Sequence, residues 1–213
     1  MTTSPAAAPR SIPTIGLVGG IASGKSAVRS ILADLGCITC DSDDLAHQAL
    51  RDPAIIRSIG ARWGDRAIRD GAVDRGALAA IVFADPAERA QLEALVHPWI
   101  HARRRAMFST DPGGAPARVI DAPLLLEVGL HTECDSIWFV EAPIEARQAR
   151  AMASRGWPAA ELARREAAQW PLDQKRALAH HVLRNDGDPQ SLRSRVEAAL
   201  ADTLRTHAHA KGT

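Results

Sequence analysis

The stretch Gly19-Gly20-Ile21-Ala22-Ser23-Gly24-Lys25-Ser26 decides the fold, because it matches the phosphate-binding pattern G-x-x-x-x-G-K-[ST]. The apolar run Ile15–Val18 precedes it, and apolar residues at helical spacing follow from Ala27 to Leu35. A strand that leads through a glycine-rich turn into a helix points several backbone N–H groups at one place, where a polyphosphate can bind. Lys25 can reach the outer phosphates, and the Ser26 hydroxyl can coordinate Mg²⁺. The sequence therefore predicts a polyphosphate site between a strand and a helix.

Further apolar runs have the length and composition of strands, and helical patterns separate them. The predicted strands are Ile15 to Val18, Cys37 to Cys40, Val119 to Ala122, Ile137 to Val140 and His181 to Leu183. Strands that alternate with helices favour an α/β doubly wound sheet with mainly parallel strands. The binding site of such a sheet lies at the carboxyl ends of its strands.

The interval from Leu45 to Met107 is too long for a simple crossover and is dense in Ala, Leu, Ile and Arg. Its predicted breaks are at Asp52-Pro53, Gly60, Gly64, Asp70-Gly71 and Asp85-Pro86. We interpret residues 45–108 as a small helical insertion within one domain of residues 14–205. Residues 1–13 and 206–213 are predicted to be flexible tails.

The composition is that of an ordinary soluble protein. The chain has 213 residues, of which 46% are hydrophobic and 24% charged, so it can form one substantial core. A net charge of +1 gives no reason to expect nucleic acid or an anionic membrane as a partner. There is no apolar run of about 18 residues, the length that a membrane span needs. No coiled-coil repeat predicts a particular oligomeric state.

The chain's 3 cysteines are too few for a disulfide framework, which is typical of a protein of the reducing cytoplasm. Cys37 and Cys40 match the C-x-x-C pattern of metal and redox sites. On a strand, however, residues three apart point to opposite faces, so the pattern favours packing over zinc binding.

Carboxylates follow two of the predicted strands. Asp41 and Asp43 follow the second strand, and Asp121 lies near the end of the third. At the carboxyl edge of a parallel sheet, all are expected to lie near Lys25 and Ser26. One carboxylate can alternatively cap the helix that is predicted to begin near Leu45. Because capping needs only one acidic group, we expect another to contact an acceptor hydroxyl.

The region from about Glu145 to Arg176 is helical and rich in cations. These are Arg147, Arg150, Arg155, Arg164, Arg165, Lys175 and Arg176. A charge run is usually a solvated helix face. Arginines in a mobile segment beside a phosphate loop could alternatively clamp ATP, because guanidinium binds phosphate in a bidentate manner.

Taken together, several motifs resemble those of dephospho-CoA kinases, over about residues 15–200. The motifs are the phosphate loop, Asp41-Ser42-Asp43, His97-Pro98, Pro123-Leu124-Leu125-Leu126-Glu127, Gln169 and Asn185-Asp186-Gly187. The resemblance implies transfer of the ATP γ-phosphoryl group, with Mg²⁺, to the ribose 3′-hydroxyl of dephospho-CoA. It also implies a P-loop kinase fold with a helical CoA-binding insertion over residues 45–108 and an arginine-bearing lid over residues 145–176.

The resemblance also implies roles for individual residues. Asp43 would be the base for the 3′-hydroxyl, and Lys25 the main cation at the γ-phosphate. Ser26 would bind Mg²⁺, and Asp121 would hold the metal through water. Arg150 would be the lid arginine, with Arg155 as a second contact.

Further binding residues follow from the same resemblance. ATP would contact the loop residues Gly20, Ile21, Ala22, Ser23, Gly24, Lys25, Ser26 and Ala27, with adenine near Asn185 and Gly187. The acceptor dephospho-CoA would contact Asp41, Asp43, Arg75, His97 and Arg103. Alternatively, His97 packs between helices beside Pro98, and Asn185-Asp186-Gly187 is simply a turn.

The sequence departs from the family pattern at a few positions. Ala22 stands where Gly is usual, which is tolerable if its φ is negative, and Ala27 where Thr is usual. Arg147 replaces the usual Gln, and Ala179-His180 the usual Ala-Asp, at the nucleotide edge. Other small-molecule P-loop kinases and nucleotide-binding switches stay open as alternatives. A GTPase would need Asn-Lys-x-Asp, and residues 185–188 lack the lysine.

Overall fold

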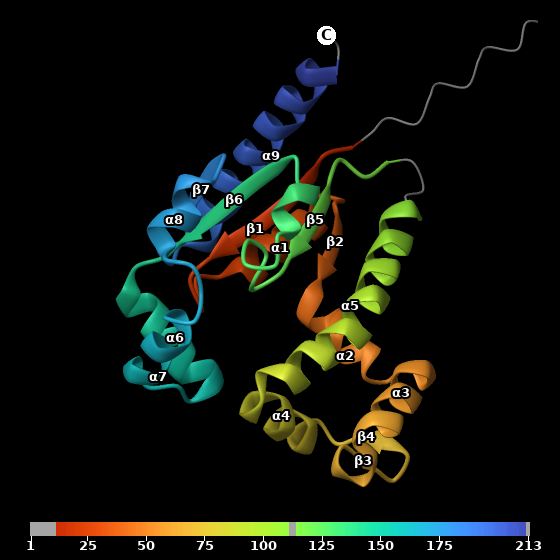
Figure 1. The fold of residues 1–213 in the computed structure, drawn as a ribbon. Helices are drawn as coiled ribbons and strands as arrows, with labels where there is room; N and C mark the ends of the chain where they lie inside the picture. Colours follow the sequence, from red (N-terminus) through yellow and green to blue (C-terminus); the bar gives the residue numbers. More distant parts are fainter. Residues whose placement is uncertain (1–11, 111–113, 212–213) are drawn as a thin grey trace, which may run out of the picture. The chain divides into compact units, whose positions relative to one another are not determined.

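The computed structural model describes residues 12–110 and 114–211 (Figure 1). The chain divides into two compact units. The core unit comprises Met1–Cys40 and Asp111–Thr213, and the helical unit comprises Asp41–Thr110. The predicted N-terminal tail lies outside the described residues except for Ile12 and Pro13.

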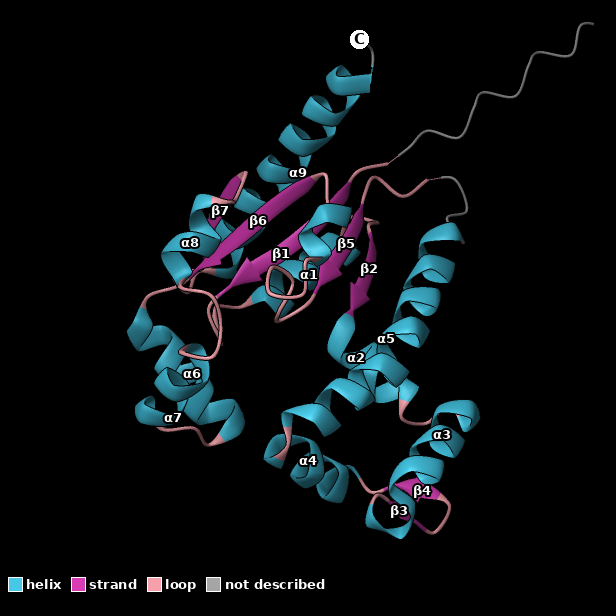
Figure 2. Ribbon diagram, in the orientation of Figure 1, coloured by secondary structure: helices cyan, strands magenta, loops and turns pink. Residues whose placement is uncertain are grey.

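Within the described residues, the main sheet has five strands in the order β2-β5-β1-β6-β7 (Figure 2). The strands are β1 (Thr14–Gly19), β2 (Ile38–Asp41), β5 (Arg118–Asp121), β6 (Ser136–Glu141) and β7 (His181–Arg184). β1 pairs in parallel with both β5 and β6, and β6 pairs in parallel with β7. The predicted α/β fold is confirmed, and each predicted strand is correct to within one residue at its ends.

Helices α1 (Lys25–Asp34) and α9 (Pro189–Lys211) pack together and supply one side of the main core. The core joins Val28 and Leu32 of α1 and Val196 of α9 to buried strand residues such as Leu17 and Val140. Because side chains alternate along a strand, residues 15 and 17 face this core together.

The end of α9 differs from the prediction. The helix continues to Lys211, so residues 206–211 are helical and not a flexible tail, while residues 212–213 lie outside the described part. Thr203 is buried and its Oγ1 lies 3.2 Å from His181 Nε2. His207 Nδ1 lies 3.7 Å from Asp135 Oδ1. These contacts hold the last turns of α9 against the sheet.

Gly16 faces the segment that connects β5 to β6, which contains the 3-10 helix η2 (Leu130–Glu133). A Cβ atom at Gly16 would lie 2.8 Å from Cys134 Sγ and 3.1 Å from Leu125 Cδ1. Only glycine allows this close approach, so the segment packs directly on the backbone of β1.

The C-x-x-C pair lies at the start of β2. Cys37 and Cys40 are buried, and neither forms a disulfide within the described residues. Burial raises the pKa of the Cys37 thiol to about 11, although a backbone hydrogen bond with Ala117 acts in the opposite direction. Because the thiolate is the nucleophile and the metal ligand, this protonated thiol is unsuited to either chemistry at neutral pH.

The cationic region after β6 forms three short helices, α6 (Ile144–Arg155), α7 (Ala159–Glu166) and α8 (Leu172–Ala177), within the described residues. Arg164 and Arg165 are exposed and pair with Glu161, as expected for a solvated face. Arg147 and Lys175 are instead buried. The region is therefore only in part a solvated surface.

The helical unit contains α2 (Ser42–Ala49), α3 (Pro53–Trp63), the 3-10 helix η1 (Gly64–Arg66), α4 (Arg75–Ala84) and α5 (Pro86–Ser109). Asp52 and Asp85 cap α3 and α5, each followed by proline at the first helical position. The break predicted at Gly60 is wrong, because α3 continues through it to Trp63, with Gly64 as the C-cap residue. A Cβ atom at Gly60 would lie 3.6 Å from Ile68 Cγ1, so this glycine is a packing site.

A short antiparallel hairpin of β3 (Ile68–Arg69) and β4 (Ala72–Val73) was not predicted within the insertion. Its turn residues Asp70 and Gly71 have φ values of 52° and 76°. Positive φ at both positions is the type I′ turn that Asp-Gly favours, so the sequence signal for a hairpin was present.

None of the helices in the described part of the chain is long and apolar enough to cross a membrane.

Candidate active site

The predicted phosphate loop connects β1 to α1 in the core unit. β1 ends at Gly19, and α1 begins at Lys25 with Gly24 as its N-cap residue. Among the described residues, no side chain caps this helix. The N-cap glycine has no side chain that could accept from the first N–H groups of α1, which carry the positive end of the helix dipole. This is a favourable place for a phosphate.

Asn185 fixes the shape of the loop. Its buried side chain donates from Nδ2 to the Ser23 carbonyl at 2.7 Å. Gly24 has a φ of 98°, and a Cβ atom there would lie 2.0 Å from the same Nδ2. Gly24 is therefore needed both for its backbone conformation and for this contact. The Asn185 amide thus holds the loop, and its place near adenine stays a prediction.

Ala22 has a positive φ of 58°. We expected alanine to be tolerated here if its φ were negative, and that condition is not met. The left-handed conformation brings the Cβ atom close to the following carbonyl oxygen, which glycine avoids. The loop imposes this conformation because the residues on both sides are held by the Asn185 and Glu166 side chains. Ala22 therefore stores backbone strain at the phosphate loop.

Replacing Ala22 by glycine is expected to relieve this strain and to raise the free energy of unfolding by about 1 kcal/mol. Urea denaturation would measure the change. The matched control is Ala33→Gly, at an exposed position inside α1, which is expected to lower stability by about 1 kcal/mol. A loss of stability in both variants would contradict the strain at Ala22.

The Lys25 ammonium group lies at the loop itself. Its Nζ is 3.4 Å from the Gly19 carbonyl and 3.5 Å from the Gly20 carbonyl. Both distances exceed the usual 2.9–3.0 Å or so for such a bond. The ammonium group is therefore placed at the start of the loop, where it could meet a phosphate.

Arg150 of α6 reaches the same loop. Its guanidinium lies 3.4 Å from the Ala22 carbonyl, 3.3 Å from the Ser23 carbonyl and 3.4 Å from the Asn185 carbonyl. Arg155, predicted as the second contact, instead lies over the Trp157 ring at 4.9 Å. Because these two arginines are separated by more than a helical turn, the structure brings only Arg150 of the pair to the loop.

The other arginine at the loop is Arg147, which the prediction of site residues missed. Its Nη1 donates to Glu166 Oε1, and the same carboxylate oxygen accepts a hydrogen bond from the Ile21 N–H at 2.9 Å. A Cβ atom at Gly20 would lie 2.7 Å from Arg147 Nη1. Arg147 also lines a cavity of about 300 Å³ beside Gly20. The replacement of Gln by Arg at position 147 was the available sequence signal.

The predicted metal ligands belong to facing elements. Arg29 follows Ser26 by three residues, so the two side chains share a face of α1. Arg29 Nε lies 3.2 Å from Asp121 Oδ2, at the end of β5. Asp121 therefore faces the side of α1 that carries Ser26. A hydroxyl and a carboxylate are oxygen ligands of the kind that Mg²⁺ prefers, so the chemistry of these two residues fits a magnesium site. The described residues contain no cluster of three or more His, Cys, Asp or Glu side chains for a metal.

In the helical unit, Asp41 is the capping carboxylate. Its Oδ1 accepts from the N–H groups of Asp43 and Asp44 at 3.0 and 3.2 Å, and α2 begins at Ser42 rather than near Leu45. Asp43 therefore lies in the first turn of the helix. Asp44 accepts a hydrogen bond from Gln48 Nε2 at 2.8 Å. These contacts show that Asp41 caps the helix. The contact of Asp43 with the hydroxyl of the acceptor substrate stays a prediction.

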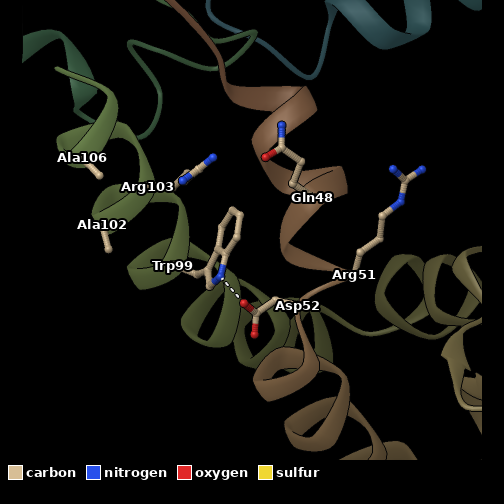
Figure 3. Close-up of a pocket in the computed structure, with 7 residues that line it drawn as sticks. All are labelled: Gln48, Arg51, Asp52, Trp99, Ala102, Arg103 and Ala106. Carbon is tan, nitrogen blue, oxygen red and sulfur yellow. Dashed lines mark hydrogen bonds between the residues drawn. The ribbon is translucent and has the colours of Figure 1, made fainter. Parts of the chain in front are cut away.

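A cavity of about 520 Å³ lies between α5 and the end of α2 (Figure 3). Arg51 and Arg103 line it, and Trp99 donates from Nε1 to Asp52 Oδ2 at 2.9 Å. This hydrogen bond and those from the backbone N–H groups lower the pKa of Asp52. Two guanidinium groups and one carboxylate leave the wall net positive, which suits a phosphate-bearing ligand. Arg51 was not predicted as a site residue.

The other predicted acceptor contacts are not part of the cavity wall. Arg75 begins α4, and its Nη2 lies 2.7 Å from His47 Nε2. His97 is exposed on α5, next to Pro98 within the helix. Of Arg75, His97 and Arg103, only Arg103 lines the cavity.

Behind the loop, Lys175 is a buried cation that joins two of the recognised motifs. Its Nζ lies 2.9 Å from Glu127 Oε1 and donates to Gln169 Oε1 at 2.9 Å. Burial acts to raise the pKa of Glu127, but hydrogen bonds from Lys175 and the Trp170 N–H, with the charge of Lys175, hold it below its usual value. Glu127 of the Pro-Leu-Leu-Leu-Glu stretch therefore connects to Lys175 and Gln169 of the cationic region after β6.

Lys175→Met is expected to lower the free energy of unfolding by about 3–5 kcal/mol, because it leaves the Glu127 carboxylate without its cation in a largely buried place. Guanidinium denaturation would measure the change. The double variant Lys175→Met/Glu127→Leu removes both charges and is expected to recover most of the loss. If the double variant were as unstable as the single one, the ion pair would not be the cause.

A model of the dephospho-CoA kinase family matches residues 13–191. Among curated relatives, a dephospho-CoA kinase of Synechococcus sp. (strain CC9902) is 42% identical over 87% of this chain and 94% of its own length. The Geobacter sulfurreducens dephospho-CoA kinase is 40% identical over 88% of this chain and 96% of its own.

Solved structures support the fold. A crystal structure from Thermus thermophilus has a TM-score of 0.77 and 36% sequence identity, and the match covers 90% of this chain and 97% of that one. A dephospho-CoA kinase from Campylobacter jejuni has a TM-score of 0.66 at 21% identity, over 91% of this chain and 98% of that one, and supports the fold alone. The motif resemblance is thus confirmed, and the chain belongs to the dephospho-CoA kinase family.

Proposed function

We propose that the protein transfers the γ-phosphoryl group of ATP to the ribose 3′-hydroxyl of dephospho-CoA and so forms coenzyme A. The observation that carries this proposal is the phosphate loop. There the start of α1, the Lys25 ammonium group and the Arg150 guanidinium group come together. Membership of the dephospho-CoA kinase family supports the choice of acceptor.

The donor half of the site binds and neutralises the phosphates of ATP. Backbone N–H groups of the loop and of α1 donate hydrogen bonds to the phosphate oxygens, while Lys25 and Arg150 act on the transferred group. Phosphoryl transfer depends mainly on positioning and charge stabilisation, because its transition state is loose. The loop contacts of Asn185 and Arg150 provide this positioning by holding the Ser23 carbonyl.

The Ser26 hydroxyl and the Asp121 carboxylate would hold Mg²⁺, which would supply further neutralisation of the phosphate charge. Asp121 now pairs with Arg29, so it exchanges this partner when it takes part in the site. Before that exchange, Arg29 orients the carboxylate toward α1.

The acceptor half is assigned to the helical unit. Asp43 accepts the proton of the 3′-hydroxyl, and its place in the first turn of α2 fixes the direction of the carboxylate. Arg103 and Arg51 bind the diphosphate of dephospho-CoA in the cavity between α5 and the end of α2. We further propose that the protein acts in the reducing cytoplasm, because its 3 cysteines are too few for a disulfide framework.

A coupled assay of ADP release tests the function. The purified protein is supplied with ATP, Mg²⁺ and one acceptor at a time: dephospho-CoA, adenosine, several nucleoside monophosphates or a sugar acid. We expect turnover with dephospho-CoA far above that with the others. Turnover with a monophosphate or sugar acid alone would point to a different small-molecule kinase, and nucleotide binding without turnover would point to a switch protein.

A further inference from the structure

The lid carries an acidic side chain that lies on the phosphate loop. Glu166 is the last residue of α7, and its Oε1 accepts hydrogen bonds from the Ile21 N–H and from Arg147 Nη1. Only 8% of the Arg147 side chain and 20% of the Glu166 side chain are exposed. One carboxylate oxygen thus joins α6, α7 and the loop within the core unit.

This carboxylate has the contacts that a phosphate oxygen would have. The Ile21 N–H belongs to the anion-binding loop, and a guanidinium group binds carboxylate and phosphate with the same geometry. A second anion cannot take the hydrogen bonds from the Ile21 N–H and from Arg147 Nη1 while Glu166 accepts them. Its charge would also repel a polyphosphate that enters the loop, since the two anions would be only a few ångströms apart in a poorly solvated place.

We propose that Glu166 competes with the phosphates of the nucleotide for the Ile21 N–H and the Arg147 guanidinium group. When ATP displaces Glu166, Arg147 becomes a further nucleotide-binding residue. This inference rests on the proposed function, because it takes ATP as the ligand. The exchange keeps Arg147 paired with an anion throughout, so a buried cation is never left alone. It also couples nucleotide entry to release of α7 from the loop.

The surroundings favour an exchange of this kind. Arg147 lines the cavity of about 300 Å³ beside Gly20, so its guanidinium group has space for a new partner. Gly20 has no Cβ atom, and one would lie 2.9 Å from Glu166 Oε1. The loop backbone is therefore directly accessible to the anion that occupies this position.

Isothermal titration of ATP·Mg²⁺ into the full-length protein tests the proposal through variants of Glu166. Glu166→Ala is expected to tighten nucleotide binding by about tenfold, because it removes the competitor and releases Arg147. Glu166→Gln keeps an acceptor for the Ile21 N–H but loses the charge, so an increase of about threefold is expected. The matched control is Glu161→Gln, on the same helix and paired with Arg164 and Arg165 instead, which is expected to bind as the wild type does.

The role of Arg147 is tested in a double-mutant cycle. Arg147→Met is expected to weaken ATP binding by about tenfold. In the double variant Arg147→Met/Glu166→Ala, most of the gain from Glu166→Ala should be lost, because the freed cation is absent. NMR-detected exchange of the Ile21 amide in the nucleotide-free protein gives an independent readout, and it should be faster in Glu166→Ala.

Unchanged or weaker ATP binding in both Glu166 variants would overturn the proposal and make the pair a purely structural contact. So would a Glu166→Ala gain of the same size with and without Arg147. These outcomes differ from a failure of the proposed function. In that case the wild type would bind no ATP, or would bind it without phosphorylating dephospho-CoA.

Discussion

Arg150→Met is expected to lower kcat for dephospho-CoA phosphorylation by at least about 10³-fold, because an arginine that acts on a transferring phosphoryl group contributes about 10³ to 10⁵ in rate. In the structure its guanidinium lies within 3.3–3.4 Å of two loop carbonyls and is thereby placed beside the phosphates. Steady-state kinetics at saturating ATP and acceptor would measure the change.

Arg155→Met is the matched control for this prediction. Arg155 lies on the same helix but over the Trp157 ring, so its removal is expected to change kcat by less than about threefold. The two variants thus separate the two arginines that the sequence placed in the same role. A large loss in Arg155→Met with little change in Arg150→Met would reverse the assignment.

Asp43→Asn is expected to lower kcat by about 10² to 10⁴-fold, the usual contribution of general acid–base catalysis, and to change the KM for ATP little. The substitution keeps the size of the side chain and removes only its ability to accept the hydroxyl proton. Kinetics with dephospho-CoA as the varied substrate and then ATP as the varied substrate would resolve the two parameters.

The neighbouring residue provides a control for the helix itself. Asp44 lies in the same turn of α2 and accepts a hydrogen bond from Gln48. Asp44→Asn removes the same charge from the start of the helix, where it contributes only about 0.3–1 kcal/mol to stability. Near-normal turnover in Asp43→Asn, or equal losses in both variants, would remove Asp43 from the role of the base.

The sheet and the phosphate loop could be predicted from the sequence because both depend on local patterns. β1 and β6 are short apolar runs. The residues that define the phosphate loop, Gly19, Gly24, Lys25 and Ser26, lie within eight consecutive positions. Even the missed hairpin at Asp70-Gly71 has a local signal. Local sequence is enough where backbone conformation alone decides the element.

The contacts around the loop could not be predicted in this way, since they depend on tertiary structure. Arg147 and Glu166 meet across 19 residues and two helices, and Asn185 meets Ser23 across 162 residues. No periodicity relates these positions. The positive φ of Ala22 has the same origin. Contacts made by side chains distant in the sequence impose this conformation, which is unfavourable for alanine.

Buried charges are the other feature that composition conceals. Lys175 and Arg147 belong to a segment whose charge run is typical of a solvated surface, yet both are buried with carboxylate partners. Arg147 pairs with Glu166 of the same segment, and Lys175 pairs with Glu127 outside it. A sequence reveals the number of cations but not which of them have a partner close enough to offset the loss of solvation.

The position of the transferred phosphate is the most direct test of the proposed phosphorylation of dephospho-CoA at its ribose 3′-hydroxyl. The protein is incubated with ATP, Mg²⁺ and dephospho-CoA, and the product is analysed by ³¹P NMR and mass spectrometry, with Lys25→Met as the control for contaminating kinases. The account predicts one new phosphate monoester on the ribose 3′-oxygen, with coenzyme A as the product of the wild type and almost none from the variant. ATP consumed without a 3′-phosphate, or equal product from both proteins, would contradict it.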